Sequence, residues 1–101
     1  MRGYSGSTQV STKPLEQSET LEETGVTHPA TVILFNDEVH TFEEVITQLV
    51  KALRCSLHRG EELALEAHTR GKAAVFTGSL VRCMEISGIL EEIELMTQIE
   101  V

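Results

Sequence analysis

One amphipathic segment, residues 42–53, constrains the fold of this chain more than any other part of the sequence. Its apolar residues recur at i, i+3, i+4, i+7, i+8 and i+11, a spacing that places them on one side of an α-helix. These residues are Phe42, Val45, Ile46, Leu49, Val50 and Leu53. Such a helix is stable only when its apolar side is buried, so the pattern predicts a helix packed against a core.

The start of this helix is predicted by its capping residues. The hydroxyl of Thr41 is placed to accept a hydrogen bond from the amide of Glu44, and the Glu44 carboxylate is placed to accept one from the amide of Thr41. This reciprocal pair, a capping box, satisfies amides that have no partner within the helix. We therefore expect the helix to begin directly after Thr41.

A buried strand is predicted before this helix. The composition changes at Ala30, and residues 31–35 form a β-branched and apolar run that ends at the turn-forming pair Asn36-Asp37. We therefore expect a strand over residues 31–35, followed by a loop that leads to Thr41.

Four further elements are predicted after residue 53. A second helix runs from about Leu57 to Arg70 and ends at Gly71, a second strand covers 73–77, and Ser79 caps a third helix that reaches about Glu91. The last residues, 93–101, alternate apolar and polar side chains with a period of two, which predicts a third strand.

This order, β-α-α-β-α-β, predicts an α+β two-layer sandwich. Short strands cannot bury an apolar face alone, so we expect three helices on one face of a three-stranded antiparallel sheet. With 101 residues, the chain can form one compact core. We assign residues 30–101 to this domain and interpret residues 1–29, which are rich in Ser, Thr, Glu and Gly, as a flexible N-terminal tail.

Charge and composition argue against several classes of partner. A net charge of −8, from 16 acidic and 8 basic side chains, would repel nucleic acid. No apolar run approaches the roughly 20 residues that cross a bilayer, so we expect no membrane association. Cys55 and Cys83 lie far apart in a chain without a secretory signal pattern, and we interpret both as reduced thiols of a cytoplasmic protein. We expect a monomer.

Two blocks of sequence resemble one known family. Residues 32–46, Val-Ile-Leu-Phe-Asn-Asp-Glu-Val-His-Thr-Phe-Glu-Glu-Val-Ile, resemble the strand, acidic loop and first helix of the ClpS family, in which an Asn-Asp-acidic triplet follows the strand. Residues 64–73 are similar to the family's motif that ends in His-x-x-Gly-Lys-Ala, at the spacing that the family shows. The resemblance covers about residues 30–80 well.

The resemblance implies an adaptor rather than an enzyme, without a cofactor or metal. Such an adaptor binds the free N-terminal residue of a substrate protein, with a preference for Leu, Phe, Tyr or Trp, and delivers that protein to the N-terminal domain of a Clp AAA+ unfoldase. An ammonium group offers three donors and a positive charge, and therefore needs a cluster of acceptors. The positions that match the family's amino-group ligands are Asn36, Asp37 and His68.

The resemblance also implies a side-chain pocket and contacts to the substrate backbone. The pocket wall is matched by Phe42, Val45, Ala64, Ala67 and, at the less closely matched C-terminal end, Leu95. The backbone or loop contacts are matched by Glu38 and by His40, which stands where the family has a Thr.

Some positions depart from the family pattern. The family often carries Met at the positions of Phe42 and Ala64, which alters the shape of the expected pocket. In the third helix, Ser79 and Met84 stand where the family has an acidic and a basic residue implicated in unfoldase docking. These departures favour an alternative hypothesis, in which a ClpS-like interaction domain has lost recognition of N-terminal residues and binds another partner.

The residue patterns alone also admit simpler interpretations. Asn36-Asp37 can be a turn that only ends a strand, and His28, His40 and His58 are of the kind that usually lies on the surface or packs without binding a ligand. Cys55 and His58 offer two metal ligands where a structural zinc site needs four. The chain has no phosphate-binding loop and no nucleophile elbow, so thiol chemistry at Cys83 is the remaining enzymatic hypothesis.

Overall fold

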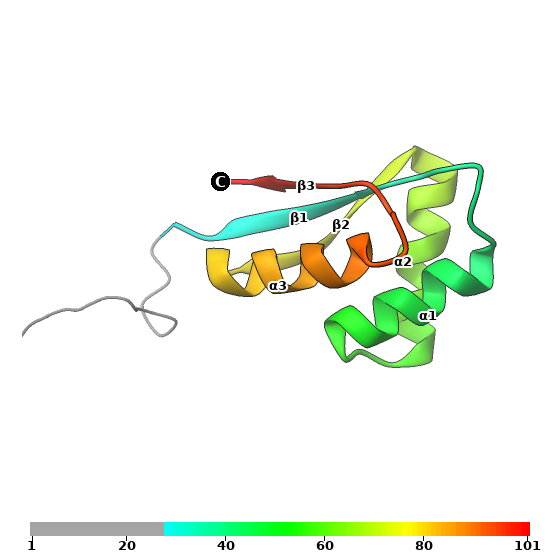
Figure 1. Cartoon of the computed structure of the whole chain (residues 1–101), viewed down its shortest axis with the longest axis horizontal. Helices are drawn as coiled ribbons and strands as arrows, with labels where there is room; N and C mark the ends of the chain where they lie inside the picture. The colour runs from blue at the N-terminus through cyan, green and yellow to red at the C-terminus, as the bar shows by residue number, and fades with distance from the viewer. Residues whose placement is uncertain (1–27) are drawn as a thin grey trace, which may run out of the picture.

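The computed structural model of this protein describes residues 28–101, which form a three-stranded antiparallel sheet and three α-helices (Figure 1). The elements, in chain order, are β1 (Ala30–Phe35), α1 (Phe42–Leu53), α2 (Leu57–Arg70), β2 (Lys72–Gly78), α3 (Leu80–Glu91) and β3 (Thr97–Glu100). The predicted fold class and element order are confirmed. Apart from His28 and Pro29, the predicted tail, residues 1–29, lies outside the described residues.

The sheet has the order β2-β1-β3, so β1 is its central strand. Ala30 pairs with Gly78 and Leu34 with Ala73 on one side, and Leu34 pairs with Thr97 on the other. Because both neighbours run antiparallel to it, β1 carries the acidic loop out at the end of the sheet where β2 and β3 begin. The chain's C-terminus lies at the opposite end (Figure 1).

The core lies between the sheet and the helices. In β1, the side chains of Ala30, Val32 and Leu34 are buried against the helical layer. Helix α3 packs against all three strands, α2 packs against β2, and α1 packs against both other helices. The predicted apolar side of α1 contributes through Ile46 and Leu49, which are buried in this core.

The helix ends follow from local chemistry. The capping box predicted at Thr41 and Glu44 is present, with distances of 2.9 Å and 3.1 Å for its two hydrogen bonds. Ser56 and Ser79 cap α2 and α3 without a reciprocal partner, since each side-chain oxygen accepts one hydrogen bond, from the amide of Arg59 and of Arg82 respectively. Gly71 ends α2 with a φ of 89°, a left-handed conformation that costs glycine little because it lacks a Cβ atom.

The third strand is shorter than predicted. The alternating pattern over 93–101 indicated one continuous strand, but β3 covers only Thr97–Glu100, and the prediction is wrong for 93–96. The chain after α3 turns instead, because Glu94 donates its amide to the carbonyl of Glu91 and adopts a φ of 68°. The turn directs Leu95 into the core. An apolar residue at this position therefore fits the alternating pattern although it does not belong to a strand.

Candidate functional site

A cavity of about 420 Å³ opens where the end of β1, the loop after it, α1, α2 and the segment before β3 meet. This volume is in the range of small-molecule binding sites. The residues that line it are Leu34, Phe35, Asn36, Asp37, Glu38, His40, Phe42, Val45, Ala64, Leu65, Ala67, His68 and Leu95. Polar residues of the loop stand at one end, and mainly apolar residues of the helices form the rest.

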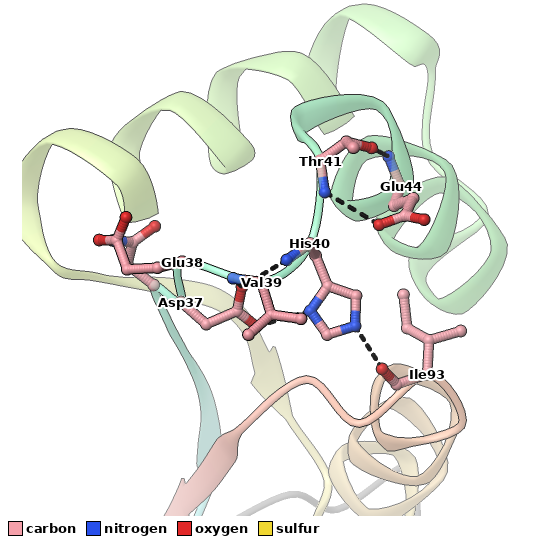
Figure 2. Close-up of polar contacts among 8 residues, drawn as sticks. Asp37, Glu38, Val39, His40, Thr41, Glu44 and Ile93 are labelled. Carbon is pink, nitrogen blue, oxygen red and sulfur yellow. Dashed lines mark hydrogen bonds and ion pairs between the residues drawn. The ribbon is translucent and has the colours of Figure 1, made fainter.

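The carboxylate of Asp37 organises the acidic loop. Its Oδ1 accepts hydrogen bonds from the backbone amides of Val39 and His40, each at 3.0 Å. Its Oδ2 accepts a hydrogen bond from Nδ1 of His40 at 2.7 Å (Figure 2). These contacts close the loop into a compact turn, which an Asp at this position favours.

The ring of His40 also reaches the segment after α3. Its Nε2 donates to the backbone carbonyl of Ile93 at a distance of 2.5 Å (Figure 2). The imidazole therefore lies between the acidic loop and the segment that leads to Leu95. Only 14% of its side chain is exposed, and 24% of the side chain of Asp37.

The hydrogen bonds of this pair shift both pKa values in the direction that favours charge. Burial by itself raises the pKa of Asp37, but the hydrogen bonds from His40 and Val39 outweigh it, so the net pKa lies below the usual value. The pKa of His40 is raised, first by its hydrogen bond to Asp37 and then by its hydrogen bond to the Ile93 carbonyl. Asp37 is therefore ionised and His40 is an imidazolium over a range of pH that extends above the ordinary pKa of histidine.

The other loop residues lie beside this pair. The backbone amide of Asn36 donates to the carbonyl of Gly71 at 3.0 Å, which ties the loop to the end of α2. The side-chain nitrogen of Asn36 lies 3.5 Å from a carboxylate oxygen of Glu38. Within residues 28–101, no hydrogen bond uses the amide oxygen of Asn36, a residue that lines the cavity.

The helices supply the remaining walls. His68 is exposed on α2, one turn after Ala64, so the spacing i, i+4 brings both to the cavity. Ala64 and Ala67 are almost fully buried, and their small side chains leave open the space that larger residues would fill. Phe42, which is 43% exposed, and Val45 face them from the first turn of α1. Leu95, buried from the segment before β3, completes the wall.

The structure brings every residue predicted for the site to this one cavity. Sequence reasoning missed Leu34, Phe35 and Leu65, which also line it. The position of Leu65, three residues before His68 on the same helix, is a signal that could have indicated its place at the rim. The individual roles of the predicted residues remain predictions.

The described part of the chain lacks the features of a membrane-spanning helix and of a metal site. No helix within residues 28–101 is long and apolar enough to cross a membrane. The same residues contain no group of three or more His, Cys, Asp or Glu side chains that could hold a metal ion. Cys83 is buried, and burial raises the pKa of its thiol.

Comparison with known families identifies the relatives of this chain. Residues 27–98 match the model of the family described as ATP-dependent Clp protease adaptor protein ClpS. The chain belongs to the ClpS family. The family is one of protease adaptors, and the match covers β1 to the first half of β3 and every residue that lines the cavity.

Two similar proteins are a human ubiquitin ligase and a bacterial ClpS protein of known structure. The ClpS domain is 34% identical over 58 residues to the human E3 ubiquitin-protein ligase UBR2, a match that covers 57% of this chain but only 3% of that protein. A solved structure of Agrobacterium tumefaciens ClpS2 bound to L-phenylalaninamide has a TM-score of 0.67 and 23% sequence identity, and the match covers 71% of this chain and 94% of that one. At this identity, the structural likeness concerns the fold.

Proposed function

We propose that this ClpS domain binds the free N-terminal residue of a polypeptide, with a preference for Leu, Phe, Tyr and Trp. The observation that supports this proposal is the union, in one cavity, of polar acceptors and an apolar recess. Asn36, Asp37 and His68 would accept hydrogen bonds from the ammonium group. The side chain of the same residue would enter the space between α1 and α2.

The two parts of the cavity select for different properties of the ligand. An internal residue of a protein has no ammonium group, so it cannot donate the charge-assisted hydrogen bonds that the acceptors of the cavity would receive from a free N-terminus. A small first residue would leave the apolar walls uncovered and lose the burial of roughly 1.5–3 kcal/mol that a large side chain provides. Only a free terminus with a large apolar side chain satisfies both.

We further propose that the bound protein is delivered to a Clp-type AAA+ unfoldase, and that the N-terminal tail, residues 1–29, takes part in this transfer. Membership of a family of Clp protease adaptors supports the destination. The domain itself would perform no catalysis and need no cofactor. Purified chain should accelerate degradation of a Leu-initiated reporter by its cognate Clp protease.

A second destination is favoured by the match to UBR2. The same recognition of N-terminal residues would then select substrates for ubiquitin transfer rather than for a Clp protease. Met84, in the position where the family has a basic docking residue, is 58% exposed on α3. Retained peptide binding without any acceleration of Clp degradation would favour this second candidate.

The binding activity is tested by titrating short peptides that begin with Leu, Phe, Tyr, Trp or Gly, each with a free and with an acetylated N-terminus. Acetylation removes the charge and the donors, so we expect affinity for the apolar peptides to fall at least about 30-fold. The Gly peptide should bind weakly in either form. Equal affinity for the free and acetylated forms would refute the proposal and favour a domain that has lost recognition of N-terminal residues.

A further inference from the structure

The most unusual contact at the edge of the site is the bridge made by His40. Its Nδ1 lies 2.7 Å from the Asp37 carboxylate and its Nε2 lies 2.5 Å from the Ile93 carbonyl oxygen. Asp37 and His40 belong to the loop after β1, whereas Ile93 is 53 residues further along the chain. One ring thus joins the polar end of the cavity to the segment that supplies its last apolar wall (Figure 2).

The partners of the ring define its protonation state. A carbonyl oxygen can only accept, so Nε2 must carry a proton. The Asp37 carboxylate already accepts hydrogen bonds from two backbone amides, which stabilise its ionised form, and an ionised carboxylate can also only accept. Nδ1 must therefore carry a proton as well. A neutral ring has one N–H and could keep only one of these two hydrogen bonds.

The far side of the bridge lies close to the ligand cavity. Ile93 is two residues before Leu95, which is buried and lines the cavity. The start of the segment is also tied to α1, since Lys51 pairs with Glu92 at 2.8 Å, and the last turn of α3, directly before the segment, is tied to α1 by Gln48, which donates to the Ile89 carbonyl at 2.6 Å. Those ties fix its distance from α1, whereas His40 fixes its distance from the acidic loop.

We propose that His40 acts as a positioning residue: its imidazolium holds the acidic loop against the segment that carries Leu95, and peptide affinity falls when the ring loses a proton. The second half of this statement rests on the proposed function. A neutral ring would present a lone pair either to the Asp37 carboxylate or to the Ile93 carbonyl, and that contact would become repulsive. The loop and the wall would then no longer be held at one spacing.

The groups that face His40 all favour its charged form. From the loop it meets the carboxylate of Asp37, and Glu44 of α1 adds a favourable electrostatic attraction. His40 also lines a second cavity, of about 430 Å³, together with Glu43 and Glu44. From the segment after α3 the neighbour is the uncharged but electronegative carbonyl of Ile93. The raised pKa of His40 agrees with this surrounding of acceptors.

The protonation state is tested first without any ligand. The ring nitrogens of ¹⁵N-labelled chain are followed by NMR from pH 5 to 9 in the wild type and in Asp37→Asn, with His40 assigned by comparison with His40→Gln. We expect the wild-type His40 ring to remain doubly protonated above pH 6.5 and its midpoint to move down in Asp37→Asn. A wild-type midpoint at or below the ordinary histidine value, or one unmoved by Asp37→Asn, would overturn the proposal.

Peptide affinity tests the consequence for binding. A Phe-initiated peptide is titrated against the wild type, His40→Gln and the matched control His58→Gln, whose histidine is 81% exposed on α2. Gln carries its donors on a single nitrogen, which cannot replace two ring nitrogens that point in different directions, and it has no charge, so we expect His40→Gln to bind about fivefold to tenfold more weakly at pH 6. Because the wild-type ring loses its proton as pH rises, this difference should shrink toward pH 9, while His58→Gln follows the wild type throughout.

The comparison between variants isolates the effect of His40 on peptide affinity. All three proteins contain His68 and are titrated with the same peptide, whose ammonium group titrates near pH 8. Parallel profiles for the wild type and His40→Gln, or equal affinities at pH 6, would overturn the positioning role. Absence of binding by the wild type would refute the proposed function and the binding half of this inference, and the NMR titration would still decide whether His40 is an imidazolium.

Discussion

The two ends of the ligand cavity are built on different physical principles. The polar end is a short loop, held in place by hydrogen bonds to the Asp37 carboxylate and by the His40 bridge. The apolar end includes Ala64, Ala67 and Leu95, which are nearly fully buried and are fixed by core packing. The polar end should therefore respond to changes of charge and pH, and the apolar end to changes of side-chain volume.

The largest effect is expected at Asp37. Asp37→Ala removes the proposed ligand of the ammonium group and the acceptor of the hydrogen bonds that close the loop. Loss of charge-assisted hydrogen bonds of about 2–3 kcal/mol should weaken binding of a Phe-initiated peptide roughly 30-fold to 150-fold. The matched control is Glu61→Ala on the exposed surface of α2, which removes the same charge away from the cavity. Similar affinities for the two variants would contradict the assigned roles of the two ends.

A volume change at the apolar end should alter selectivity rather than recognition of the terminus. Ala64→Met fills part of the recess, so we expect peptides that begin with Trp or Phe to bind about tenfold more weakly and Leu peptides to be affected less. Thermal unfolding of the variant checks that the fold is intact. An equal loss for all first residues would mean that Ala64 does not border the side chain of the ligand.

The helix cap that ends the acidic loop should have a smaller effect. Thr41→Ala breaks the capping box of α1 and should lower the free energy of unfolding by about 1 kcal/mol. We expect a change in peptide affinity of less than about threefold, because the Asp37 and His40 contacts remain. Chemical denaturation and the same peptide titration measure the two quantities. A large loss of affinity at unchanged stability would show that the cap, rather than Asp37, positions the loop.

The pH dependence of stability is the smallest of these effects. The pKa of His40 is raised above its ordinary value of 6.5, so its stabilising contribution is fully present below about pH 6.5 and is lost as pH rises through the raised pKa. The pKa of Asp37 is lowered, so its contribution is present above pH 3.8 and is lost as pH falls through the lowered value. The difference in thermal midpoint between the wild type and His40→Gln should therefore be greater at pH 6 than at pH 9. A constant difference would exclude this linkage.

Local patterns were sufficient to predict most of the fold. The apolar spacing of residues 42–53, the capping box at Thr41 and the glycine at 71 each concern neighbours within a few positions, and the helices they predict are present. The prediction failed in the segment before β3, where Leu95 is buried by a turn rather than by a strand. An alternation of apolar and polar residues shows only which side chains are buried, and a turn can bury the same residues as a strand.

The site was predictable only as far as the family resemblance reached. The site residues predicted from the two matching blocks line one cavity, but Leu34, Phe35 and Leu65 of the same blocks were missed because their place depends on how β1 and α2 pack. The bridge from His40 to the Ile93 carbonyl could not be predicted either, because any residue 53 positions away can supply a backbone carbonyl and no sequence pattern indicates it. Such contacts require the tertiary arrangement.

The proposed recognition of an unblocked N-terminus by the charge of Asp37 can be measured with a thermodynamic cycle that crosses Asp37→Asn with acetylation of a Phe-initiated peptide. Asn keeps an oxygen acceptor for the loop amides and removes the charge. Isothermal titration should give a loss of about 30-fold or more on acetylation in the wild type and only a few-fold loss in Asp37→Asn. Equal losses in the two proteins would show that the ammonium is recognised elsewhere, and would contradict this account of the cavity.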